Sequence, residues 1–157
     1  MSEPPGLGTR LRHLLELLDG DVAQVYADMD LEGFRPRFTP VVRALVAQGP
    51  LPIRDLAKAV SVTHSAASQT VTQMEKYGLV TLEPGADARQ RIVRLTGKSR
   101  ALLPKLDAEW AATTAAAEEF EAELPYSLSE LLAEATRVLE RRPFRERIAD
   151  AARALEK

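Results

Sequence analysis

Residues 53–95 are predicted to form two helices and two strands in an order that few folds contain. The segments 53–60 and 63–76 have helical spacing, and only a short turn separates them. Two strands are then predicted at 80–83 and 91–95, joined by the turn sequence Pro-Gly-Ala-Asp. Helix, turn, helix and hairpin in this order predict a winged helix-turn-helix, whose second helix fits the major groove of DNA.

The second of these helices separates its side chains into an apolar and a polar face. Ala67, Val71 and Met74 recur on one side and form its expected core face. From this helix we expect the following residues to contact DNA: Thr63, His64, Ser65, Ser68, Gln69, Thr72 and Gln73. Gln69 can pair bidentately with adenine, a contact worth about 1–3 kcal/mol of discrimination. An ordinary solvated helix face would look similar, and His64 can equally be a simple exposed residue of the first turn.

The predicted hairpin carries arginines at and after its tip. We expect Arg89 to enter the minor groove, with Asp87 holding the loop by bonding to its backbone or to Arg89. Arg91 and Arg94 add expected phosphate contacts, although only one of these two alternating positions can face DNA. Lys98 and Arg100 follow as further phosphate partners. The alternative is an ordinary edge hairpin, whose charges protect it from aggregation.

The net charge of −2 hides an uneven distribution along the chain. Residues 1–52 carry a net charge of −2, residues 53–105 carry +5, and residues 106–157 carry −5. The middle segment therefore suits contact with a polyanion, whereas the two ends suit another role. A winged-helix module that only contacts other proteins is the alternative, but it would not need this basic segment.

Helical spacing also predicts the elements outside this unit. A first helix is expected from Thr9 to near Gly33, followed by the loop sequence Phe-Arg-Pro-Arg-Phe. Thr39 is expected to cap the next helix, whose apolar stripe is Val41, Val42, Leu45 and Val46. A long helix is expected over 96–123, and two further helices are expected from Ser127 and after Pro143.

The segment 34–103 resembles the multiple-antibiotic-resistance-regulator (MarR) family of bacterial transcription regulators. Three motifs carry the resemblance: the helix pair LAKAVSVTHSAASQTVTQMEKYGLV, the sequence D-x-R at Asp87 and Arg89, and the continuation L-T-x-K-x-R at 95–100. Many winged-helix families share the helix pair, but the D-x-R and LTxK spacing is more specific. The family often has arginine where this chain has Gln69, which puts the base preference in question.

The resemblance implies a mainly α fold with a small β-hairpin wing. Its implied domains are an N-terminal dimerisation helix at 1–36, a winged helix-turn-helix lobe at 37–100 and C-terminal dimerisation helices at 101–157. Leucine stripes near both ends support a homodimer, because they are too numerous for so thin a core: Leu11, Leu14, Leu15, Leu18, Leu128, Leu131, Leu132 and Leu139. Packing within one chain is the alternative.

The resemblance further implies a sequence-specific DNA-binding transcription regulator. We expect a repressor that binds a pseudo-palindromic operator as a homodimer and is released by a small-molecule effector. Family members often bind phenolic or anionic ligands, and the candidate residues are His13, Tyr26, Phe34, Arg37, Phe38 and Trp110. The same residues can instead be core and loop anchors.

Motifs of other function classes are missing from the sequence. It has no cysteine, two histidines, no glycine-rich phosphate loop and no HExxH spacing, so we expect no enzyme, metal site or cofactor. It also shows no secretory signal and no apolar run long enough to cross a membrane, so a cytoplasmic protein is expected.

Overall fold

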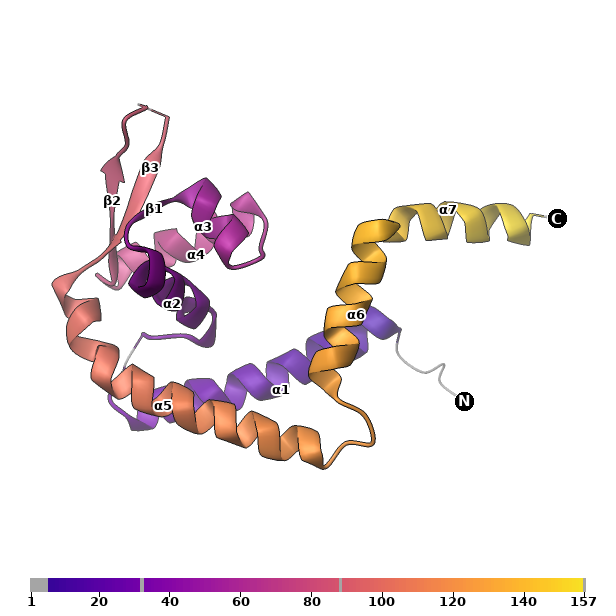
Figure 1. Cartoon of the computed structure of the whole chain (residues 1–157), viewed down its shortest axis with the longest axis horizontal. Helices are drawn as coiled ribbons and strands as arrows, with labels where there is room; N and C mark the ends of the chain where they lie inside the picture. Colours follow the sequence, from indigo (N-terminus) through magenta and orange to yellow (C-terminus); the bar gives the residue numbers. More distant parts are fainter. Residues whose placement is uncertain (1–5, 32, 88, 157) are drawn as a thin grey trace. The chain divides into compact units, whose positions relative to one another are not determined.

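The computed structural model describes residues 6–31, 33–87 and 89–156 of the 157-residue chain. Its elements are, in order, α1 (Leu7–Asp28), η1 (Pro36–Phe38), α2 (Thr39–Gln48), β1 (Leu51–Pro52), α3 (Ile53–Ala59), α4 (His64–Lys76), β2 (Val80–Pro84), β3 (Arg91–Leu95), α5 (Gly97–Ala122), α6 (Leu128–Arg141) and α7 (Phe144–Leu155). Figure 1 shows the mainly helical structure and its small sheet, which confirm the expected fold class. The chain divides into two compact units, Met1–Asp107 and Ala108–Lys157.

The sheet of the first unit has three antiparallel strands in the order β1-β3-β2. The two expected strands, β2 and β3, pair from Val80 opposite Leu95 to Pro84 opposite Arg91. They form the wing, the hairpin that projects away from α2, α3 and α4 in Figure 1. The sequence did not indicate β1, because two residues are too few to show an alternating pattern.

The core of the winged-helix lobe lies between α2, α3, α4 and the sheet. Its buried side chains are Val41, Val42, Leu45, Leu56, Ala57, Ala67, Val71, Met74, Leu79, Val80, Val93 and Leu95. The expected core face of α4 is confirmed by this set. Val46, however, was wrongly expected in the core of α2, since 54% of it is exposed. It lies about 40° beyond Val42 around the helix, at the edge of the buried stripe.

Helix α1 ends at Asp28, earlier than the expected end near Gly33. Asp30 has φ 56°, a left-handed conformation that turns the chain out of the helix. The amide of Leu31 then donates to the carbonyl of Tyr26 at 2.9 Å, which closes the helix end. The loop that follows is not wholly irregular, because it contains the short η1 helix.

Thr39 does not cap α2, contrary to expectation. It is the first residue of the helix, and Phe38 holds the N-cap position. Pro40 still lies in the first turn, where the missing amide costs no hydrogen bond. The hydroxyl of Thr39 instead lies 2.9 Å from the phenol oxygen of Tyr26. This contact connects the start of α2 to α1 within the first unit.

Thr96 joins the start of α5 to the residues that follow α4. Its Oγ1 donates to the carbonyl of Gly78 at 2.7 Å and accepts from the amide of Ser99 at 3.2 Å. The buried Ser99 hydroxyl also donates to the carbonyl of Leu79. Helix α5 continues without a break past Pro104.

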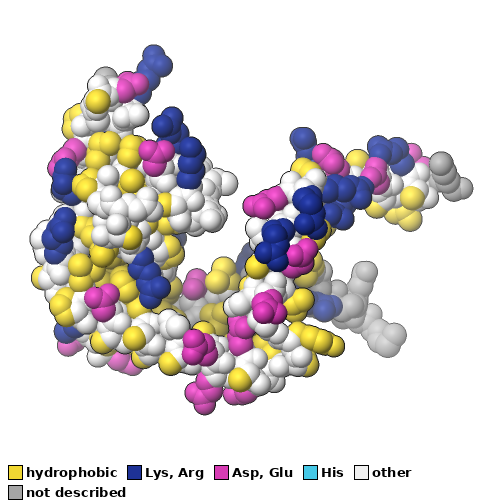
Figure 2. All heavy atoms as spheres, viewed as in Figure 1, with side chains coloured by type: hydrophobic (Ala, Val, Ile, Leu, Met, Phe, Trp, Pro, Cys, Tyr) yellow, Lys and Arg dark blue, Asp and Glu magenta, His cyan; other side chains and the backbone are white. Residues whose placement is uncertain are grey.

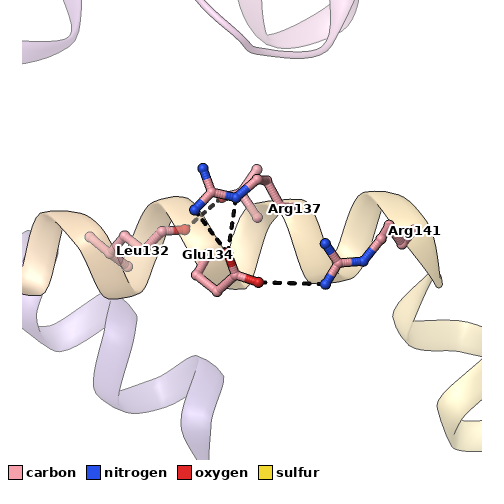
Figure 3. Close-up of polar contacts among 5 residues, drawn as sticks. Leu132, Glu134, Arg137 and Arg141 are labelled. Carbon is pink, nitrogen blue, oxygen red and sulfur yellow. Dashed lines mark hydrogen bonds and ion pairs between the residues drawn. The ribbon is translucent and has the colours of Figure 1, made fainter.

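The second unit contains the rest of α5 together with α6 and α7. Helix α6 starts after Ser127, close to the expected position, and Ser127 caps it by accepting a bond from the amide of Glu130 at 3.2 Å. Pro143 separates α6 from α7, and Figure 1 shows a bend between the two helices. On the polar side of α6, Glu134 pairs with Arg137 at 2.8 Å and with Arg141 at 3.5 Å (Figure 3).

Apolar side chains of the outer helices remain at the surface of the single chain. No described residue of α6 or α7 is buried. Their exposed large apolar residues are Leu131, Leu132, Leu139, Phe144, Ile148 and Leu155. On α1 the exposed set is Leu7, Leu11, Leu15, Leu17, Leu18 and Val25. Packing within one chain therefore leaves most of the predicted leucine stripes uncovered.

Candidate nucleic-acid interface

A tight turn places α4 after α3. Ser61 has φ 56°, and the amide of Val62 donates to the carbonyl of Ala57 at 3.0 Å. Thr63 then caps α4, since its Oγ1 accepts a bond from the amide of Ala66 at 3.1 Å. The other amides of the first turn have no acceptor within the helix, so this exposed end can receive a phosphate oxygen.

The polar face of α4 is solvent-exposed along its length. Ser65, Gln69 and Thr72 are exposed on this face, as expected. Thr72 donates its hydroxyl to the carbonyl of Ser68 at 2.9 Å. Gln73 lies partly buried, and its amide oxygen accepts a bond from Arg37. Gln73 thus contacts the segment before α2, a neighbour that the sequence pattern did not indicate.

The tip of the wing is held by Asp87, as expected. The amide of Arg89 donates to Oδ1 of Asp87 at 3.0 Å, and the amide of Gln90 donates to the Asp87 carbonyl at 2.8 Å. Gly85 closes the loop through its amide, which donates to the carbonyl of Gln90 at 2.9 Å. A Cβ at Gly85 would lie 2.8 Å from the Cβ of Gln90, so only glycine fits this approach.

A groove of about 460 Å³ lies between the wing and the start of α4. It is lined by Pro52, Ile53, Arg54, His64, Ser68, Asp87, Arg89, Gln90 and Arg91. The structure thus brings together five of the expected DNA-contacting residues from two separate elements. Thr63, Ser65, Gln69 and Thr72 lie elsewhere on α4, and Gln73 lies near its other end.

Arg54 is a groove residue that sequence reasoning missed. It is the second residue of α3, which directly follows β1, and β1 pairs with β3 through Leu51 opposite Val93. This pairing brings Arg54 beside the wing, although Arg54 and the wing are far apart in the sequence. Its ion pair with Asp55 is long, 3.4 Å, and both side chains are exposed, so it contributes little. The sequence feature that could have indicated Arg54 as a DNA-contact residue is its position as a basic residue near the start of a helix.

The arginines of β3 lie on different faces of the wing. Arg91 lines the groove, whereas Arg94 points to the other face and pairs with Glu83 at 3.2 Å. Lys98 donates to the carbonyl of Tyr77 at 2.8 Å and so holds the end of α4. Figure 2 shows basic side chains at the wing tip and along this lobe. Of the basic residues of the middle segment, Arg54, Arg89 and Arg91 line the groove.

A second cavity, of about 550 Å³, lies between α1 and the segment that leads to α2. It is lined by Arg12, Leu15, Glu16, Asp19, Gly20, Ala23, Gly33, Phe34, Arg35, Pro36 and Arg37. Two of the effector candidates, Phe34 and Arg37, face it. Burial raises the pKa of the Asp19 carboxyl above its ordinary value.

The other effector candidates do not line this cavity. Tyr26 and Phe38 are buried in the first unit, where Tyr26 packs edge-on against Phe34 at 5.0 Å and Phe34 against Phe38 at 5.8 Å. His13 is exposed on α1, and Trp110 is buried and belongs to the second unit. The sequence therefore indicated residues of an aromatic cluster, but it did not indicate which of them line the open cavity.

Tyr77 extends this aromatic row to the end of α4. Its ring centroid lies 6.2 Å from that of Phe38, and its hydroxyl accepts a bond from Arg35 at 3.2 Å. The hydrogen bond and positive charge of Arg35 lower the pKa of Tyr77. Gly33 packs directly on the ring, because a Cβ there would lie 2.5 Å from its Cδ1.

Among the residues that the structure describes, no group of three or more acidic, histidine or cysteine side chains could hold a metal ion. Within the same described ranges, no helix is both long enough and apolar enough to cross a membrane.

Comparison with known proteins supports the assignment of the lobe. A model of the MarR family matches residues 36–91, which hold α2, α3, α4, β2 and the loop of the wing. No curated protein sequence matches the chain. Solved structures, by contrast, share its fold over most of both chains.

Three such structures illustrate the likeness. The transcriptional regulator MOSR of Mycobacterium tuberculosis, solved with DNA, has a TM-score of 0.67 and 19% identity, covering 95% of this chain and 99% of that chain. The DNA binding of BpsR of Bordetella bronchiseptica is regulated by 6-hydroxynicotinic acid. BpsR has a TM-score of 0.64 and 18% identity, and the match covers 89% of this chain and 96% of the BpsR chain. PcaV of Streptomyces coelicolor, solved with its natural ligand, has a TM-score of 0.59 and 23% identity, and the match covers 96% of this chain and 99% of the PcaV chain. The matched lobe at residues 36–91, its arginine-bearing wing and the shared fold make this chain similar to the MarR family of transcription regulators.

Proposed function

We propose that this protein is a sequence-specific DNA-binding transcription regulator. The groove between α4 and the wing carries this proposal, because it gathers Arg54, Arg89 and Arg91 beside the polar face of α4. Cations that are spaced along a groove suit the phosphates of a duplex. MOSR, which has the same fold, was solved with DNA, and an Escherichia coli MarR variant was solved with operator DNA at a TM-score of 0.63 and 18% identity.

In this proposal each part of the lobe has its own contact with the duplex. Helix α4 enters the major groove, where Gln69 and Thr72 reach base edges from its exposed face. The capped start of α4 receives a phosphate, with Thr63 holding the helix end. Arg89 enters the minor groove from the wing tip, where the negative potential is strongest.

The protein acts as a homodimer in this proposal. The apolar side chains of α1, α6 and α7 that stay exposed in one chain need a cover, and a second copy offers matching stripes. The segments 1–36 and 101–157 then serve dimerisation, while 37–100 binds DNA. A two-fold dimer places two copies of α4 on a pseudo-palindromic operator.

The cavity beside α1 receives the effector. Arg12, Arg35 and Arg37 provide positive charge, and Leu15, Ala23 and Phe34 provide apolar walls, a combination that suits a small aromatic anion. BpsR responds to such a compound, 6-hydroxynicotinic acid. We propose that the protein represses its target genes and leaves the operator when this cavity is filled.

Selection of duplexes from a randomised pool, followed by fluorescence anisotropy over a range of salt concentrations, tests the DNA-binding function. The expected result is an enriched inverted repeat, bound by two chains, with an affinity that falls steeply as salt rises. A protein-interaction module would enrich no sequence. That result would overturn the proposal, and sedimentation of the free protein would separately test the dimer.

A further inference from the structure

The segment between α1 and α2 lies against two functional regions at once. On one side, Gly33, Arg35 and Arg37 line the cavity beside α1. On the other side, the same residues contact the C-terminal end of α4: Arg37 donates to the amide oxygen of Gln73, and Arg35 donates to the hydroxyl of Tyr77 at 3.2 Å. The two guanidinium groups are therefore shared between the cavity and the recognition helix.

The packing of this segment leaves it little freedom to move independently of α4. Gly33 has φ 83° and touches the Tyr77 ring so closely that no side chain fits between them. Phe38 is fully buried and packs on Tyr77, while Pro36 lies between the two arginines. A displacement of Arg35 or Arg37 is thus transmitted to the last turn of α4, since packed interiors do not deform continuously.

Arginine is well suited to change partners at this position. Its planar guanidinium pairs more strongly with a carboxylate, in bidentate geometry, than with a neutral amide or phenol oxygen. The amide of Gln73 and the hydroxyl of Tyr77 are neutral acceptors, and both contacts are exposed to solvent. An anion in the cavity would therefore compete effectively for both guanidinium groups.

We propose that Arg37, supported by Arg35, is the positioning residue that couples the cavity beside α1 to the recognition helix, through its exchange between Gln73 and a bound carboxylate. The proposal rests on the proposed function, since it assumes that α4 reads DNA. In the empty state Arg37 holds Gln73 and fixes the C-terminal half of α4. In the filled state the carboxylate takes the guanidinium, and α4 loses this support. Because coupling is reciprocal, bound DNA also disfavours the anion.

A double-mutant cycle on Arg37 and Gln73 tests the first half of the proposal. The affinity for the selected duplex is measured for the wild type, Arg37→Ala, Gln73→Ala and the double variant. Each single change is expected to weaken DNA binding by about threefold to tenfold, and the double variant no further than either. Additive losses, or no loss in Arg37→Ala, would overturn the proposal.

Benzoate as a probe tests the second half. It is expected to weaken DNA binding by the wild type, whereas its neutral analogue benzamide is not. In Arg37→Ala the response to benzoate is expected to disappear, and in Arg37→Lys it is expected to return in part. Arg43→Ala is the matched control, because Arg43 is an exposed arginine of α2 that lines neither cavity described above.

The outcomes separate this proposal from the proposed function. A wild type that binds the selected duplex but ignores benzoate overturns the coupling alone. An Arg37→Ala variant that responds to benzoate as the wild type does has the same consequence. A wild type that enriches no duplex overturns the proposed function, and the coupling proposal with it. Thermal unfolding of each variant verifies that the compared proteins are folded.

Discussion

Arg94 and Glu83 form an ion pair across the wing, with Nε of Arg94 3.2 Å from Oε1 of Glu83. The pair lies on the face of the hairpin opposite the buried Val93, because successive side chains of a strand point to opposite faces. Arg91 shares the face of Val93 and lines the groove beside α4. The register of β3 therefore assigns different roles to two arginines that look equivalent in the sequence.

From this difference we expect Arg91→Ala to weaken DNA binding more than Arg94→Ala. Loss of one phosphate contact should lower the slope of log affinity against log salt by about 1 in Arg91→Ala. Arg94→Ala should change that slope little, since its guanidinium is paired on the other face. Anisotropy titrations of both variants at several salt concentrations measure this. Equal slopes for the two variants would contradict the assignment of faces.

Substitutions at the wing tip distinguish the contribution of the loop conformation to DNA binding from the contribution of its charges. Arg89→Ala should lower DNA affinity at least several-fold without unfolding the protein, because it removes the side chain expected in the minor groove. Asp87→Ala should also lower it, since the Arg89 amide loses its acceptor. Asp87→Asn keeps an acceptor oxygen and removes a negative charge, so it should bind at least as well as the wild type. If Asp87→Ala binds as well as Asp87→Asn, the loop-holding bond is unimportant.

Gly33→Ala should destabilise the first unit. The positive φ alone costs a residue with a side chain about 1–2 kcal/mol, and the new methyl group would also meet the Tyr77 ring. Gly20→Ala is the matched control, because its Cβ meets nothing within 4 Å and it lies inside α1. This control should stabilise the protein by about 0.5–1 kcal/mol. Urea unfolding of both variants measures the two free energies, and equal effects would contradict the close packing at Gly33.

Acidic substitutions on α6 should prevent dimerisation. Leu132 and Leu139 are exposed in the single chain and lie on one face of α6, so Leu132→Asp with Leu139→Asp should give a monomer in sedimentation velocity. DNA affinity should fall as well, because one lobe then binds one half-site. Glu140→Ala, on the polar side of the same helix, should leave the dimer intact. A dimer that survives the double substitution would place the interface elsewhere.

Much of the winged-helix lobe could be predicted because its signals are local. Asp87 holds the wing as expected, and Thr63 caps α4 while Gly78 follows its end in a left-handed conformation. These residues act on neighbours within a few positions, so the sequence already contains both partners. The burial of Val71 and Met74 follows in the same way from helical spacing.

The errors and omissions arise where the partner is distant in sequence. Thr39 resembles a helix cap, but its hydroxyl contacts Tyr26 instead. The DNA contact of Gln73 stays a prediction, but the bond that it accepts from Arg37 was not indicated by the sequence. Arg54 reaches the groove only because β1 pairs with β3. No local pattern reveals such contacts, since each depends on how separate elements pack.

The sequence by itself indicated the resemblance to the MarR family, most of the order of helices and strands, the basic middle segment and the residues that build α4 and the wing. Spacing, capping and turn chemistry act over a few residues, and charge is a property of composition. Only the tertiary structure decided which arginine of β3 faces the groove, that Arg54 joins it, and that Arg35 and Arg37 stand between the α1 cavity and α4. These relationships depend on strand register and on packing between elements distant in the chain, which one-dimensional patterns do not encode.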